Sequence, residues 1–211
     1  MIRTKRTHVG ARRVAMTVAG LLAMASTLTM AAPDHSHHHA PAAQAAAVRT
    51  IAEYRLPNVK LQRADGKRVD FAADIDDGRP VFVNFIYTTC TAICPVMTQI
   101  FAVVQTKLGP DAAKVRFVSL SIDPEQDTPR RLTEYARQYS AGPDWTFYTG
   151  TLEASIAVQK GFAAYRGDKM NHTPLTLIRA APGKPWIRLD GFASPEDLMQ
   201  EYRKLVAAAA R

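Results

Sequence analysis

The chain has little cysteine, and after residue 31 it has little concentrated positive charge. Its 211 residues include two cysteines, Cys90 and Cys94, so neither has any other cysteine with which to pair. Beyond residue 31 there is no dense cluster of Lys and Arg interleaved with aromatic residues, which leaves a nucleic-acid partner without support. We find no internal repeat and no indication of a second folded domain.

The N-terminal residues have the order of a secretory signal, with basic residues first and the apolar stretch 14–30 after them. Small residues permit cleavage after Ala31, so we interpret residues 1–31 as a signal peptide. Its removal lowers the formal net charge from +8 to +3, because five basic residues leave with it. The apolar stretch falls little short of the roughly 20 residues that span a bilayer, so an uncleaved N-terminal anchor is the alternative. Both interpretations predict an exported, periplasmic protein, either soluble or anchored to the inner membrane.

Residues 32–50 are rich in Ala and Pro and lack helical or strand periodicity, which predicts a disordered linker. Four histidines, His35, His37, His38 and His39, lie in this segment. The simpler interpretation is a solvated linker, and the alternative is low-specificity metal capture that feeds a site in the domain. Residues 51–211 then have the size of one domain with a substantial core.

The hydrophobic pattern of the domain predicts alternating strands and helices. An Asp65-Gly66 turn between two short extended runs indicates a β-hairpin over residues 61–69. The nearly continuous apolar run 81–87 is typical of a strand buried on both faces, and helical spacing indicates a helix over 95–108. Further strands are predicted at 115–122, 145–148, 175–178 and 186–192, and further helices at 129–139, 152–165 and after Ser194. This order predicts an α/β sandwich with a mixed central sheet and an N-terminal hairpin.

The two cysteines lie where a buried strand is followed by a helix. If Cys90 and Cys94 share the first helical turn, their Cβ atoms lie about 5–6 Å apart on one face. That spacing suits one metal ion held by two thiolates, whereas a disulfide needs Cβ atoms nearer ~3.8 Å. We therefore expect a switchable pair rather than a permanent disulfide. The free N–H groups at a helix N-terminus stabilise thiolate over thiol, so we expect a lowered cysteine pKa.

Two thiolates leave a coordination position for a third donor. Sulfur ligands together with an imidazole are compatible with Cu(I), Cu(II) or zinc. Of the six histidines, His8 leaves with the signal and four lie in the linker, so His172 is the only one inside the domain. It lies in the loop before the strand predicted at Leu175. A lone histidine is more often structural than a ligand, so further support is needed.

Four motifs in this order resemble the SCO/SenC family of copper-handling proteins with a thioredoxin-like fold. They are residues 83–88 before the Cys90-x-x-x-Cys94-Pro95 segment, residues 121–129, residues 145–150, and Asn171-His172-Thr173 before a strand. The resemblance implies a thioredoxin-like sandwich, in which the His172 loop faces the start of the cysteine-bearing helix. It also implies that Cys90, Cys94 and His172 bind one copper ion.

The same resemblance implies a partner. Family members help assemble the binuclear copper centre of cytochrome c oxidase or reduce its cysteines, so the expected partner is the copper-bearing subunit of that enzyme, or another exported copper protein.

The sequence departs from the family's usual motifs at two places in the site: residues 91–93 lack the family's Pro-Asp, and Asn171 stands where the family usually has Asp. The missing carboxylates remove acceptors that could orient the ligands and tune the metal.

Other interpretations of the same residues remain open. Cys90 and Cys94 could act as the redox pair of a thiol–disulfide oxidoreductase, or could form a structural disulfide. We interpret Met97 and Met170, two soft donors near the site, as packing residues or as exposed by chance. Three further residues are assigned structural roles. Asp123 is expected to end its strand near the cysteine helix, and Asp127 and Thr128 are expected to cap the next helix.

Overall fold

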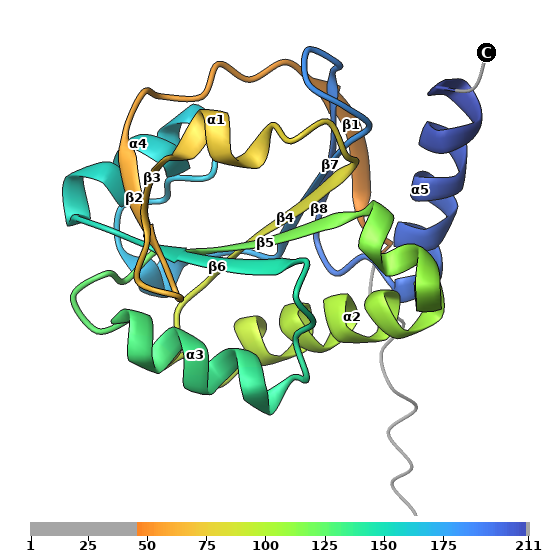
Figure 1. Ribbon diagram of the computed structural model, residues 1–211. Helices are drawn as coiled ribbons and strands as arrows, with labels where there is room; N and C mark the ends of the chain where they lie inside the picture. The colour runs from red at the N-terminus through yellow and green to blue at the C-terminus, as the bar shows by residue number, and fades with distance from the viewer. Residues whose placement is uncertain (1–45, 210–211) are drawn as a thin grey trace, which may run out of the picture. The chain divides into compact units, whose positions relative to one another are not determined.

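The computed structural model describes residues 46–209, which form a mixed α/β domain (Figure 1). The strands are β1 Val48–Ala52, β2 Lys60–Arg63, β3 Arg68–Asp70, β4 Val81–Ile86, β5 Arg116–Ser121, β6 Trp145–Thr149, β7 Leu175–Arg179 and β8 Trp186–Asp190. The α-helices are α1 Phe71–Ile75, α2 Ile93–Leu108, α3 Pro129–Gln138, α4 Leu152–Gly161 and α5 Pro195–Ala209. Two 3-10 helices, η1 Gly109–Lys114 and η2 Lys169–Asn171, complete the order.

A single sheet organises the described residues, with strand order β1-β8-β7-β4-β5-β6-β2-β3. β4, β5 and β6 run parallel, whereas β7 pairs antiparallel with both β4 and β8. Every residue of β4 and β5 is buried, as their continuous apolar runs predict for central strands. Figure 1 shows α2 and α3 on one side of the sheet and α1 and α4 on the other. The predicted mixed α/β sandwich is confirmed.

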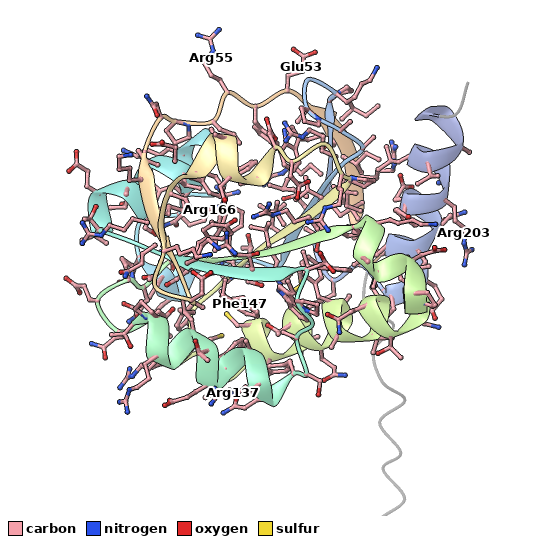
Figure 2. The ribbon with its side chains drawn as sticks, viewed as in Figure 1. Glu53, Arg55, Arg137, Phe147, Arg166 and Arg203 are labelled. Atoms are coloured by element: carbon pink, nitrogen blue, oxygen red, sulfur yellow. The ribbon has the colours of Figure 1, made fainter. Side chains whose placement is uncertain are left out.

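Aromatic side chains fill the layer between the sheet and α2. Phe101 of α2 is fully buried and lies with its ring centroid 6.2 Å from that of Phe82 on β4 and 5.6 Å from that of Phe117 on β5. Figure 2 shows Phe147 of β6 between the sheet and α3, whereas Arg137 lies on the outer side of that helix. Burying a ring of this kind removes its apolar surface from water and contributes about 1.5–3 kcal/mol. This layer therefore fixes α2, and with it the cysteine segment, against the central strands.

The predicted hairpin is confirmed, and its turn explains the Asp-Gly pair. β2 and β3 pair antiparallel, and Gly66 adopts a φ of 88°, a conformation that glycine tolerates best. The Asp65 carboxylate accepts a hydrogen bond from the backbone N–H of Lys67 at 3.0 Å. Asp65 and Gly66 together therefore stabilise the turn.

Several boundaries differ from the sequence-based expectations. The predicted linker ends earlier than residue 50, because Val48–Ala52 forms β1 and pairs with β8 at the sheet edge. α4 ends at Gly161 rather than near residue 165, and Ala163 has a φ of 51°, which no α-helix continues through. The five-residue helix α1 was not predicted. The predicted signal peptide and the linker histidines lie outside the described residues.

No helix within residues 46–209 has both the length and the apolar character needed to cross a bilayer.

Replacing Phe101 with Ala should lower the free energy of unfolding by about 3–5 kcal/mol, because it leaves a cavity among packed aromatic rings. Val96→Ala on the same helix is the matched control: Val96 is 42% exposed, and its truncation should change stability by no more than about 0.5 kcal/mol. Denaturant unfolding of the reduced protein measures both. Equal effects would contradict the described packing of α2.

Candidate metal centre

The cysteine segment follows β4, the central strand. The chain leaves β4 after Ile86, turns at Tyr87, whose carbonyl accepts a hydrogen bond from the N–H of Cys90 at 3.1 Å, and enters α2 at Ile93. Only Cys94 therefore lies in the first helical turn. Cys90 precedes the helix, so the expectation that both cysteines share that turn was wrong. The helix starts two residues before Pro95, because proline is tolerated where the first N–H groups have no intrahelical partner.

The structure nevertheless brings the two sulfurs together. The backbone N–H of Cys94 donates a hydrogen bond to Cys90 Sγ at 3.4 Å. The N–H of Tyr87 in turn donates to Cys94 Sγ at 3.4 Å. Both cysteines are free thiols in this structure. The Cys90 sulfur thus caps the start of α2, where no residue supplies a conventional side-chain cap.

The two thiols differ in acidity. Burial raises the pKa of Cys90, but hydrogen bonds from the backbone N–H groups of Cys94 and Ala92 outweigh it, so the net pKa is lowered. Cys94 is fully buried, and that burial raises its pKa well above the ordinary thiol range. The expected stabilisation of thiolate at the helix N-terminus therefore applies to Cys90 and not to Cys94. At neutral pH, Cys90 is the more nucleophilic of the two and the more available to a soft metal ion.

The Asp127 carboxylate holds the turn that precedes Cys90. It accepts hydrogen bonds from Thr88 through the backbone N–H at 3.0 Å and the hydroxyl at 2.6 Å, and from the Ser121 hydroxyl at 2.6 Å. Asp127 is fully buried, and that burial raises its pKa. The expectation that Asp127 caps the next helix was therefore wrong. Thr128 is the N-cap of α3, as predicted, and accepts from the N–H of Arg131.

His172 lies beside the carboxyl end of β4, the end from which the cysteine segment leaves. β7 pairs antiparallel with β4, with Asn84 opposite Thr176, so the loop before β7 is next to the end of β4. Burial lowers the pKa of His172, and a backbone hydrogen bond with Phe85 partly opposes that shift. The imidazole is thus neutral at pH 7, the form that binds metals. Its Nε2 is buried and has no hydrogen-bond partner among the described residues.

The loop that carries His172 is tied to the cysteine segment by its η2 residues. Lys169 Nζ forms an ion pair with the buried Asp123 carboxylate at 2.6 Å and lies 5.7 Å from the centroid of the Tyr87 ring. Met170 Sδ lies 3.8 Å from the Tyr87 hydroxyl oxygen. Through this ion pair, Asp123 holds the loop that carries His172. Asn171, which stands where an aspartate was expected, directs its amide to the carbonyl of Arg166.

The donors fit a soft metal ion in chemistry, although they are not assembled as one group. Within residues 46–209, no three His, Cys, Asp or Glu side chains lie close enough together to hold an ion. The sulfurs of Cys90 and Cys94 lie together, and His172 is at the same end of the sheet with an unpartnered nitrogen. Two thiols and one neutral imidazole are the donor types that copper and zinc prefer. Binding by all three requires the His172 loop to move toward the sulfurs.

Sequence reasoning missed Tyr87, Lys169 and the buried role of Asp127. Each acts through contacts between segments far apart in the chain, such as the 46 residues that separate Lys169 from Asp123. One signal was present, since Thr88 and Ser121 are polar residues at the carboxyl ends of two neighbouring buried strands. Such residues need a buried hydrogen-bond partner.

Cys90 should react with iodoacetamide more than about tenfold faster than Cys94 at pH 7, because it is more exposed and its pKa is lowered. The pH at which its rate is half-maximal should lie below that of an ordinary thiol, since the reactive thiolate forms as pH rises through the lowered pKa. Mass spectrometry of the alkylated peptides measures both rates. In the wild type, faster alkylation of Cys94 than of Cys90 would contradict the prediction. In Cys94→Ser, the pKa of Cys90 should stay below that of an ordinary thiol, because the backbone N–H groups of residues 92 and 94 still donate to its sulfur.

Asp127→Ala should destabilise the fold by about 1–3 kcal/mol, because it leaves buried donors of Thr88 and Ser121 without an acceptor. Asp127→Asn is the matched control, since its amide oxygen can still accept from Thr88, and it should cost less. Denaturant unfolding measures both variants. An Ala variant as stable as the wild type would show that this carboxylate does not support the turn.

Comparison with known proteins agrees with this architecture. The SCO1/SenC family model matches residues 48–207. A SCO1 protein homolog from Bacillus subtilis is 36% identical over 104 residues, and Protein SenC from Rhodobacter capsulatus is 32% identical over 100 residues. These alignments cover 49% and 47% of this chain and 53% and 44% of the relatives, so the chain spans about half the length of the curated relatives it matches.

Solved structures show the same fold. BsSco, described as a member of the Sco family of cytochrome c oxidase assembly proteins with a disulfide switch, aligns with a TM-score of 0.63 and 27% identity, covering 75% of this chain and 96% of BsSco. Copper-bound ScoI from Bradyrhizobium japonicum aligns with a TM-score of 0.60 and 23% identity, covering 74% and 99%. The expected thioredoxin-like sandwich of Sco proteins is thereby confirmed. With the family model matching most of its length, the chain belongs to the SCO1/SenC family.

Proposed function

We propose that this chain is a copper chaperone that binds one copper ion through Cys90, Cys94 and His172. The observation that carries the proposal is the buried, unpartnered Nε2 of His172 at the sheet end where the two sulfurs meet. An uncompensated buried polar atom is costly, and a metal ion is one partner that removes the cost. Family membership and the copper-bound relative that shares this fold support the same assignment.

The three donors have different roles in holding the ion. Cys90 has the lower pKa of the two thiols and is the more exposed, so it receives the ion first. Binding then displaces the proton from Cys94, because a metal-bound thiol is deprotonated even when its free pKa is high. Neutral His172 needs no deprotonation, so its contribution costs only the movement of its loop. Copper binding therefore releases a proton, and the affinity rises with pH.

The exposure of Cys90 to solvent provides the route by which the copper ion leaves the site. The ion passes to the acceptor by ligand exchange at Cys90, the cysteine that solvent reaches. As acceptor we propose the copper-bearing subunit of cytochrome c oxidase or another exported copper protein, in line with the assembly role described for BsSco. We place the reaction in the periplasm, with the domain either free after cleavage following Ala31 or anchored by residues 14–30.

A thiol–disulfide oxidoreductase would use the same cysteines in a different way. Its Cys90 thiolate attacks a partner disulfide, and Cys94 resolves the mixed disulfide, so two electrons pass to the partner and the pair is oxidised. That mechanism gives no role to His172, whose buried nitrogen would stay unpartnered. The copper proposal accounts for all three residues.

Anaerobic titration of the reduced protein with Cu(I) against a chromophoric chelator tests the proposal. The wild type should bind one equivalent, and Cys90→Ser, Cys94→Ser and His172→Ala should each weaken binding by more than about tenfold, since each removes a direct ligand. His172→Ala should also remain folded, because among the described residues the Nε2 of His172 makes no hydrogen bond that the substitution would break.

The matched control is His35→Ala in the linker, which should bind copper as the wild type does. An affinity unchanged in His172→Ala, together with rapid disulfide exchange by that variant, would contradict the chaperone proposal and favour the oxidoreductase.

A further inference from the structure

Met170 differs from the other methionines that the structure describes. Its side chain is 73% exposed, whereas Met97 and Met199 are 1% and 8% exposed. A thioether that contributes to a core gains from burial, and Met170 has almost none. Of the two expectations for Met170, packing does not fit its environment, which leaves chance exposure or a role at the surface.

The Tyr87 hydroxyl connects the Met170 sulfur to the site. Met170 Sδ lies 3.8 Å from that hydroxyl oxygen. The same hydroxyl helps to lower the pKa of the Cys90 thiol, and the backbone carbonyl of Tyr87 accepts a hydrogen bond from the N–H of Cys90 at 3.1 Å. Two soft donors from distant segments, one a thioether and one a thiol, thus lie on either side of the buried residue Tyr87.

The position of Met170 is fixed by its neighbours rather than by its own packing. Lys169 forms the 2.6 Å ion pair with Asp123, and the Asp168 carboxylate accepts from the N–H of Met170 at 2.8 Å. The backbone of η2 is therefore held while the methionine side chain remains free to turn. Such a side chain can follow a ligand without a change in the fold.

Accessibility separates the donors into an outer and an inner group. Cys94 is fully buried, and the Nε2 of His172 is buried as well. Cys90 is half-buried, and Met170 is the most exposed of the large apolar side chains within residues 46–209. An ion that arrives from solvent therefore reaches Cys90 and Met170 before it reaches Cys94 or His172.

We propose that Met170 is a further copper ligand, which together with Cys90 forms an outer position where Cu(I) is received and released. A thiolate and a thioether are soft donors, which Cu(I) prefers to oxygen ligands. The ion then shares Cys90 between this outer position and the inner position with Cys94 and His172. This inference rests on the proposed function, because it adds a residue that handles the same ion.

The test uses the full chain with its methionines replaced by selenomethionine, so that X-ray absorption at the selenium edge detects copper bound to a methionine. The His172→Ala variant removes the imidazole of the inner position, and one equivalent of Cu(I) is added to it under anaerobic conditions. We expect a copper neighbour at bonding distance from selenium, and its loss in His172→Ala/Met170→Leu. In solution, Met170→Leu in this background should lower Cu(I) affinity by about tenfold.

Met97→Leu in the same background is the matched control, because it replaces a buried methionine with a side chain of similar volume. It should leave both the selenium–copper signal and the affinity unchanged. Cysteine-dependent Cu(I) binding with no copper neighbour at selenium would overturn the role of Met170 and leave the proposed function intact. Absence of cysteine-dependent Cu(I) binding in the wild type would overturn both.

Discussion

The hydrogen bond from the N–H of Cys94 to the sulfur of Cys90 is the contact on which the site depends. It places the first sulfur over the N-terminus of α2, where backbone N–H groups favour negative charge. The same contact sets the distance between the two sulfurs without a covalent bond. The fold thereby produces one acidic, accessible thiol beside one buried thiol of high pKa. An ion can be received at the first and retained by the second.

Two features of the sheet keep this contact in place. The buried Asp127 carboxylate links Thr88, in the turn after β4, to Ser121, the last residue of β5, so the turn before Cys90 is held against the central strands. The antiparallel pairing of β4 with β7 brings the His172 loop to the same end. The imidazole and the sulfurs are therefore neighbours because of topology, although they are far apart in sequence. Closing the remaining distance requires movement of one loop and leaves the sheet unchanged.

Elements with a strong local pattern were predictable from the sequence. The continuous apolar runs predicted the buried strands β4 and β5, and the Asp65-Gly66 pair predicted the hairpin turn. The structure has all three at the predicted positions. The start of α2 was misjudged because Pro95 is typical of a first helical position, whereas the helix begins at Ile93 without a side-chain cap. The separate assumption that Cys90 and Cys94 share one helical turn gave no reason to distinguish the acidities of the two thiols.

Contacts between distant segments were not predictable in this way. Asp127 precedes a Thr-Pro pair that is typical of a helix start, so its sequence context favoured a capping role, and only the fold shows it buried beneath the cysteine turn. The exposure of Met170 likewise follows from how η2 is held by Asp123 and Asp168. Apart from the polar residues Thr88 and Ser121 beside the ends of two buried strands, neither arrangement leaves a trace in the sequence.

The central claim is that the buried Nε2 of His172 becomes a copper ligand beside the two sulfurs. Nitrogen-15 NMR of the histidine side chains, recorded before and after one equivalent of Cu(I) is added to the reduced protein, measures this atom directly. The account predicts a large shift of the His172 Nε2 resonance at one equivalent, with the linker histidines unchanged. Copper bound by the protein while that resonance stays in place would contradict it.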